Sequence, residues 1–71
     1  MFIVIEIQTT NENQIGNLVW AYETQNEAFE KYFSILSNAA VSALPVHAAV
    51  ILDNCGNQIA AQHFKHDEGE A

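Results

Sequence analysis

Three histidines and one cysteine are the residues of this chain that could ligate a metal or act as a nucleophile: His47, His63, His66 and Cys55. Zinc needs three or four nitrogen, sulfur or oxygen ligands that converge on one point. In an extended strand His63 and His66 point to opposite faces, so one chain does not bring them to a shared ion. We expect them to be solvated at a strand end. A symmetry axis that pairs His63 or His66 with its copy is the alternative route to a metal site.

His47 and Cys55 have different surroundings in the sequence. His47 follows Pro45 among apolar residues, which is typical of a packed histidine bonded to a backbone group. The alternative is an imidazole that contacts a ligand at the mouth of a sheet. Cys55 precedes Gly56 in a turn, and no Cys-His-Asn or Ser-His-Asp pattern supplies the base that a nucleophile needs. We therefore expect a protein that is not an enzyme and uses no cofactor.

Aromatic and cationic side chains could hold a ligand instead. Trp20 and Tyr22 alternate along one expected strand, so they share a face on which a base could stack. Lys31 and Lys65 are the only two cationic Lys or Arg side chains, and a phosphate group could use them with backbone N–H groups at a helix start. These four residues and His47 are the candidate ligand-binding residues. The alternatives are core or interface packing for the aromatics and two surface lysines.

The charge balance narrows the classes of partner. Of 71 residues, 2 are Lys or Arg and 9 are Asp or Glu, which gives a net charge of −7 at pH 7. DNA-binding proteins neutralise several phosphates with Lys or Arg, and anionic membranes attract basic segments. We expect neither DNA nor a membrane as partner. The single cysteine fits a reducing compartment, and the apolar start lacks the basic region of a signal peptide.

Alternating apolar residues predict two hairpins. Residues 2–9 are rich in β-branched side chains, and residues 17–23 form a second strand after a polar loop of about five residues. Residues 46–52 form a third strand that is apolar on both faces. After the turn at residues 53–57, residues 58–65 form a fourth, less hydrophobic strand, which we expect at a sheet edge.

The segment between the hairpins predicts a helix of about 18 residues. Thr24 and Glu27 have the spacing of a capping box, in which the Thr24 side chain accepts from the Glu27 N–H while the Glu27 side chain reaches back. Pro45 is expected to end the helix. A wide apolar stripe runs along it, formed by Ala28, Phe29, Tyr32, Phe33, Ile35, Leu36, Ala39, Ala40 and Ala43.

The order β-β-α-β-β predicts an α+β fold: one domain over residues 1–66, with a four-stranded antiparallel sheet and one helix on one face. Residues 67–71 are expected to be a disordered acidic tail. The strand order stays open, because the hairpins could join through the first and third strands, or the first strand could pair across a dimer.

The two-sided apolar strands predict self-association. One helix covers one face of the sheet, yet the first and third strands are apolar on both faces, and an uncovered apolar face is typical of an interface. A chain this small buries only about 60% of its surface on folding. We therefore expect a homodimer or higher oligomer, formed through the other sheet face or a sheet edge.

Two segments, Met1–Gln8 and Ala40–Val50, resemble a group of short, uncharacterised proteins encoded by prophages and phages of Gram-positive gut bacteria. The group has no assigned catalytic residues to carry over. The resemblance implies a phage accessory protein in the cytoplasm of the host bacterial cell. Some small phage proteins are similar to counter-defence factors, which sequester a nucleotide immune signal or bind and inhibit a host defence protein. Others are minor structural or assembly proteins of the virion.

Residues and resemblance together favour a small non-enzymatic binding protein. A nucleotide-like ligand would sit in pockets between subunits, lined by the aromatics, His47 and a lysine. A protein inhibitor would use its acidic surface to bind a basic patch, and the net charge of −7 favours this second reading. The alternative function is a minor structural or assembly protein of the virion.

Overall fold

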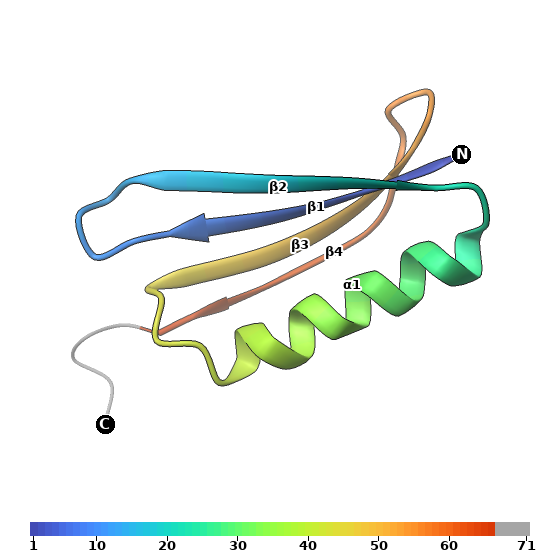
Figure 1. Ribbon diagram of the computed structural model, residues 1–71. Helices are drawn as coiled ribbons and strands as arrows, with labels where there is room; N and C mark the ends of the chain where they lie inside the picture. The colour runs from blue at the N-terminus through green and yellow to red at the C-terminus, as the bar shows by residue number, and fades with distance from the viewer. Residues whose placement is uncertain (67–71) are drawn as a thin grey trace.

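The chain forms one sheet with one helix against it, as the computed structural model shows for residues 1–66, the part that it describes (Figure 1). The elements are β1 (Phe2–Thr9), β2 (Ile15–Tyr22), α1 (Gln25–Ala40), β3 (Val46–Asp53) and β4 (Gln58–Lys65). The expected α+β class and element order are confirmed. The expected acidic tail, residues 67–71, lies outside the described residues.

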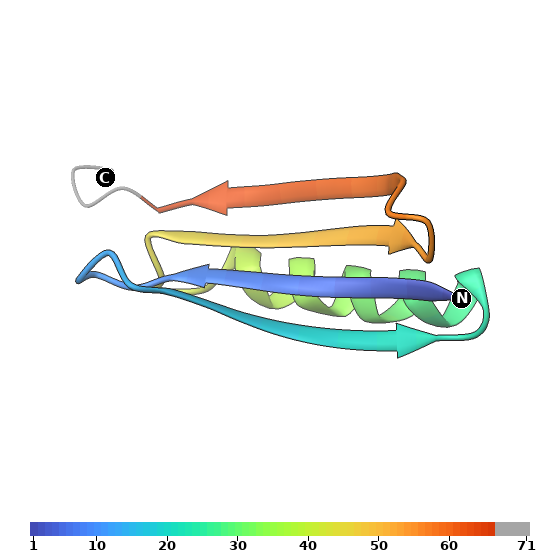
Figure 2. The same cartoon turned by 90° about the horizontal axis from the view of Figure 1, so that it is seen from above.

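The four strands are ordered β2-β1-β3-β4, and every neighbouring pair is antiparallel. The two hairpins therefore join through β1 and β3, one of the two arrangements that the sequence left open. The less hydrophobic β4 lies at an edge, as expected. Figure 2 looks onto the face of the sheet that α1 leaves uncovered, with the helix behind the strands.

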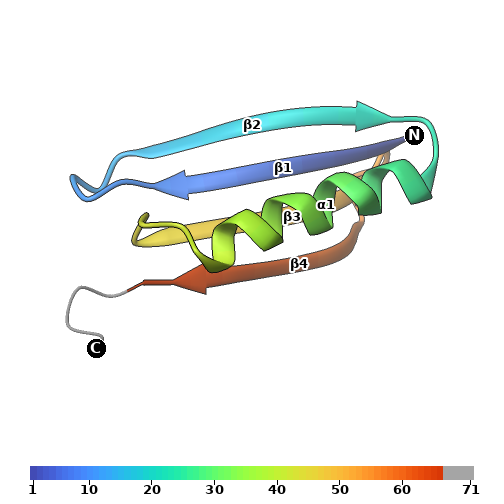
Figure 3. The ribbon, with the colours of Figure 1, turned by 60° about the horizontal axis from the view of Figure 1, so that its bottom comes forward.

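Strand register decides which side chains meet the helix. Val4 pairs with Trp20 on one side and with Ile51 on the other, and Ile51 pairs with Ala60. Because paired residues point to the same face of a sheet, one row of side chains crosses all four strands beneath α1. The helix packs mainly on β3 and β1 (Figure 3).

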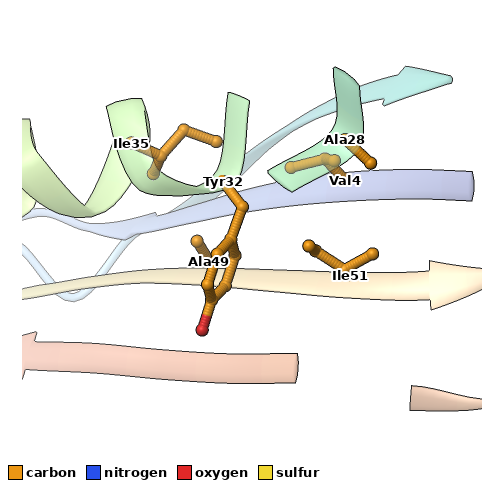
Figure 4. Close-up of a cluster of buried hydrophobic side chains, with 6 residues drawn as sticks. All are labelled: Val4, Ala28, Tyr32, Ile35, Ala49 and Ile51. Atoms are coloured by element: carbon orange, nitrogen blue, oxygen red, sulfur yellow. The ribbon is translucent and has the colours of Figure 1, made fainter. Parts of the chain in front are cut away.

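The core lies between α1 and the two central strands (Figure 4). Val4 and Ile51 are its largest fully buried side chains among the described residues. The helix contributes Ala28, Tyr32 and Ile35 to the same cluster. With two alanines, Ala28 and Ala49, among its buried members, this core buries little apolar surface per residue.

The start of α1 matches the expected cap in part. The Glu27 N–H donates to Thr24 Oγ1 at 3.2 Å, and Thr24 has extended backbone angles. The Glu27 carboxylate reaches back, but it accepts from the Thr24 hydroxyl at 3.0 Å instead of bonding the Thr24 backbone N–H. Both bonds still fix the first turn, and the carboxylate lies at the positive end of the helix dipole.

The end of α1 comes earlier than expected. The helix ends at Ala40, so the expectation that Pro45 terminates a helix of about 18 residues is wrong. The Leu44 N–H, which a longer helix would donate to the Ala40 carbonyl, donates to Ser42 Oγ at 2.9 Å. A serine side chain that captures a nearby backbone donor in this way competes with the helix.

The expected apolar stripe of α1 is wider than the surface it buries. Ala28, Tyr32, Ile35 and Ala39 are buried, whereas Phe33 is 59% exposed. The Phe33 ring contacts its helix neighbours Phe29 and Tyr32, at centroid distances of 5.7 and 5.3 Å. A single helix on a single sheet buries only the side chains that face the sheet. The apolar side chains beside them on the helix therefore stay partly in solvent.

Candidate functional site

Trp20 and Lys31 form a contact between the edge strand β2 and the helix. The Lys31 ammonium nitrogen lies over the indole ring, 4.0 Å from its centroid. Trp20 points to the helix side of β2. Lys31 is next to the buried Tyr32 in α1, and its contact with Trp20 places it on the side of the helix nearest β2. This cation–π contact covers one face of the indole. A base that stacks on that face has to displace the ammonium group.

Tyr22 lies next to this pair on the helix side of β2. It is opposite Phe2 in the register, two residues beyond Trp20. Both Trp20 and Tyr22 are partly buried and pack against the core cluster. The structure therefore brings Trp20, Tyr22 and Lys31, three of the five candidate ligand-binding residues, to the same side of the sheet. Their packing against the core is also what we expect if the two aromatic residues serve only the core.

His47 is buried beneath the helix layer and bonded to a carboxylate. Its Nε2 lies 2.5 Å from Glu6 Oε2, and the two side chains are 6% and 12% exposed. The same oxygen accepts from Gln8 Nε2 at 3.0 Å. His47 Nδ1 is buried and has no hydrogen-bond partner within residues 1–66. The expected backbone partner of His47 is thus wrong, and a side-chain contact with the Glu6 carboxylate takes its place.

Glu6 is the residue that the sequence reasoning missed. Gln8 pairs with His47 across β1 and β3, which places Glu6 one diagonal step away on the same face. The sequence does contain a sign of this contact. Glu6 alternates with the core residue Val4 along β1, and His47 alternates with Ala49 and Ile51 along β3, so both lie on strand faces that carry buried residues.

Lys65 lies on the other side of the sheet. It pairs with Val46, and His63 pairs with Ala48, so both point away from α1. Because alternate residues of a strand point to opposite faces, the sheet separates Lys65 from His47 and from the Trp20–Lys31 pair. The five candidate residues do not form one site within a single chain.

His66 is not the solvated histidine that the sequence predicted. Its Nε2 lies 2.9 Å from the carbonyl oxygen of Ala39, and its ring stacks on Phe64 with a centroid distance of 6.5 Å and an interplanar angle of 9°. It ties the end of β4 to the last turn of α1, where the Ala39 carbonyl also accepts from the Ser42 N–H at 3.2 Å. Within the described residues, no group of three or more His, Cys, Asp or Glu side chains could hold a metal ion.

The β3–β4 turn is organised by Asp53. Its Oδ1 accepts from the backbone N–H groups of Cys55 and Asn57 at 2.9 and 2.8 Å, and its Oδ2 accepts from Asn57 Nδ2 at 3.1 Å. These bonds, led by the Asn57 N–H, hold the pKa of Asp53 below its usual value of 3.8. Gly56 follows with a φ of 87°, which a glycine adopts without strain. Cys55 is exposed in this turn.

The face of the sheet opposite α1 is apolar, and we refer to it as the open face. It consists of alternate residues from each strand: Ile3, Ile5, Ile7 and Thr9; Ile15, Asn17, Val19 and Ala21; Val46, Ala48, Val50 and Leu52; and Ala61, His63 and Lys65. No element of residues 1–66 covers it (Figure 2). Val19 and Ile15 expose 59% and 71% of their surface.

Charge is distributed unequally between the two sides of the sheet. No Asp or Glu of the described residues belongs to the open face, whose one charged side chain is Lys65. Glu6 points toward α1, and Glu12 lies in the β1–β2 loop. Glu23, Glu27 and Glu30 precede or belong to the first half of α1. Within residues 1–66, the open face is therefore free of carboxylates, which lie on the helix side of the sheet and in the loops.

Comparison of the chain with protein-family models, with curated proteins and with solved structures gives no match. Among the described residues, α1 falls short of the length and apolarity that crossing a membrane requires.

Proposed function

We propose that this chain is a non-enzymatic phage accessory protein that works as a homo-oligomer in the bacterial cytoplasm. Its activity is to bind and inhibit a host defence protein that presents a basic surface. The observation that carries the proposal is the separation of charge and apolar surface across the sheet. A host defence protein is named because Met1–Gln8 and Ala40–Val50 resemble phage-encoded proteins.

Exposed carboxylates outside the open face support a basic partner. Glu12, Glu23 and Glu30 are exposed, and the whole chain carries a net charge of −7. A surface with one sign of charge accelerates the encounter with a partner of the opposite sign and selects against others. Lys31 is the one Lys or Arg of α1, so it offsets only one of the helix carboxylates Glu27 and Glu30.

Sequestration of a nucleotide signal has weaker support. A nucleotide phosphate needs several cationic groups near a stacking ring. Lys31 lies against Trp20 but covers one face of its ring, and Lys65 lies on the opposite side of the sheet. Such a ligand would require a pocket built between subunits. Nucleotide binding is therefore an outcome of the test below and not part of the proposal.

The proposal is tested by expressing the tagged chain in a bacterium that carries active phage-defence systems. We expect two results from the same cells: phage plating is restored, and a basic host defence protein copurifies with the tagged chain. The complex should release that protein as NaCl is raised, because salt screens exposed charge pairs.

A charge-reversed variant provides the comparison. Combining Glu12→Lys, Glu23→Lys and Glu30→Lys adds six charges to the net charge of −7 and leaves −1. It should lose both plating and capture. The matched control replaces the same residues with Asp, keeps the charge and should behave as wild type. Glu27 is left unchanged because it belongs to the helix cap.

Native mass spectrometry of the purified chain separates the other readings. A bound small molecule of nucleotide mass, together with unchanged activity of the charge-reversed variant, would replace the proposal by nucleotide sequestration. Copurification with phage particles and no effect on plating would replace it by a structural role in the virion. Absence of both plating and capture for the wild type would also overturn it.

A further inference from the structure

We infer that the open face binds the open face of a second copy of this chain, so that the working unit is a dimer with the helices outside and two sheets packed inside. The inference rests on the proposed function, because it names the surface through which the proposed homo-oligomer forms. The tests below distinguish its failure from a failure of that function.

The two central strands leave large side chains uncovered on this face. Ile3, Ile5 and Ile7 of β1 lie beside Val50 and Leu52 of β3, and each of them is only partly buried. The helix side, by contrast, has Val4 and Ile51 as its largest fully buried side chains. The face that lacks a cover thus carries more large aliphatic groups than the covered core. Burial of such groups is the main favourable contribution to association.

The size of the face is sufficient for a small dimer interface. Each strand has 8 residues and the sheet has 4 strands. With about 3.3 Å per residue and about 4.8 Å between strands, the face spans about 26 by 19 Å. That is a plane of about 500 Å² per copy, or about 1,000 Å² for two, which is the lower bound for a specific interface.

The charge distribution selects a second copy over other occupants. Two chains of net charge −7 repel each other unless the contact excludes their carboxylates, and the open face has none from the described residues. A basic partner would find no carboxylate to bind there, and an anionic lipid surface would repel the chain. Lys65 lies on the edge strand β4, away from the central aliphatic rows.

Packing of two such faces needs no change in the fold. Two sheets pack face to face at about 10 Å, with interdigitating side chains and strand directions within about 30° of each other. Ala48 on β3 and Ala21 on β2 lie among larger residues of the face, which leaves room for the isoleucines of the other copy. A closed two-fold pair uses the same patch on both copies and leaves no apolar face for further growth.

Val19 and Leu18 offer a matched pair of positions for the test. They are neighbours on the edge strand β2, with 59% and 53% exposure, but Val19 belongs to the open face and Leu18 points to the helix side. Val19→Lys places an ammonium group in the proposed interface, and Leu18→Lys places the same group outside it. Both positions lie in solvent in the single chain, so neither change should prevent folding.

Sedimentation equilibrium of the purified full chain is the measurement. The wild type should sediment as a dimer, twice the 7.9 kDa of one chain. Val19→Lys should raise the dissociation constant by about tenfold, because it replaces an apolar contact of β2 by an ammonium group that has to lose water on association. Leu18→Lys should leave it within about twofold, because changes outside the contact rarely matter. Far-ultraviolet circular dichroism confirms that each variant is folded.

A second measurement does not depend on variants. In a mixture of isotope-labelled and unlabelled chains, isotope-filtered nuclear Overhauser effects between different copies should connect methyl groups of Ile5 and Val50. A monomeric wild type would overturn the inference, as would equal effects of the two lysine variants or intermolecular contacts confined to α1 or the strand edges.

The partner assay of the previous section keeps the two proposals apart. A monomeric chain that still captures a basic defence protein would overturn the dimer and the homo-oligomer, and would leave standing the proposed binding and inhibition of that protein. A dimer that depends on Val19 but captures nothing and does not restore phage plating would overturn the function and leave the dimer standing.

Discussion

His47 and Glu6 place two ionisable side chains between the sheet and the helix, where apolar residues would be expected. Their direct contact and the additional bond from Gln8 satisfy the carboxylate oxygen Oε2. A buried polar group that loses its hydrogen-bond partner is costly, so each of these side chains depends on the presence of the other.

Removal of one member should be worse than removal of both. Glu6→Leu leaves His47 buried without its partner, and we expect it to lower the free energy of unfolding by about 3 kcal/mol. The double variant Glu6→Leu, His47→Leu should lose clearly less than the sum of the two single variants, because no unpaired group remains. Urea unfolding at one fixed protein concentration measures all four proteins. Additive losses would show that the two side chains do not act as a pair.

At the scale of elements, the β3–β4 hairpin depends on the Asp53 carboxylate. Its bonds to Asn57 and Cys55 hold the pKa of Asp53 in the folded protein below the usual value of 3.8. A carboxyl group with a lowered pKa contributes stability that is present above its unfolded value and is lost as pH falls through its folded value. The contribution of this turn should therefore be full at neutral pH and disappear in acid, below pH 3.8.

Asp53→Asn tests this pH dependence. At neutral pH the variant should melt at a lower temperature than the wild type, since a neutral amide accepts hydrogen bonds less strongly than a carboxylate. The difference should shrink as pH falls below about 4, where the wild-type carboxylate becomes protonated. Glu12→Gln, which alters an exposed loop carboxylate, is the control and should show no such trend. A difference that stays constant over this range would contradict the assignment.

Comparison of the expected and observed element boundaries shows which of them local sequence patterns predict. Alternation located β1 and β4 at residues 2–9 and 58–65, where the structure has them. It placed the second strand at residue 17, whereas β2 begins at Ile15 because Ile15 pairs with Thr9 across the hairpin. Thr24 and Glu27 indicate the helix start, but the helix ends at Ala40, before Pro45, and the Leu44 N–H bonds to Ser42 Oγ beyond that end.

At the scale of the whole molecule, the net charge of −7 should affect two kinds of association in opposite ways. Raising the ionic strength from about 0.01 to about 0.15 M shortens the screening length from about 30 to about 8 Å. Screening reduces repulsion between two copies, so self-association should strengthen several-fold. It also reduces attraction to a basic protein, so partner capture should weaken. Sedimentation equilibrium and partner binding in the same NaCl series measure both trends, and parallel trends would contradict the separation of the two surfaces.

The sequence by itself determined the features that depend on near neighbours: the four strands, the helix cap, the turn at residues 53–57 and an excess of apolar faces. Each of these follows from periodicity or from hydrogen bonds over a few residues. Only the tertiary structure decided which distant side chains meet. The pairing of β1 with β3 brought Glu6 to His47, and the position of α1 brought Lys31 to Trp20. Strand order and register fix such contacts, and a shift by one residue would turn each of these strand side chains to the other face of the sheet.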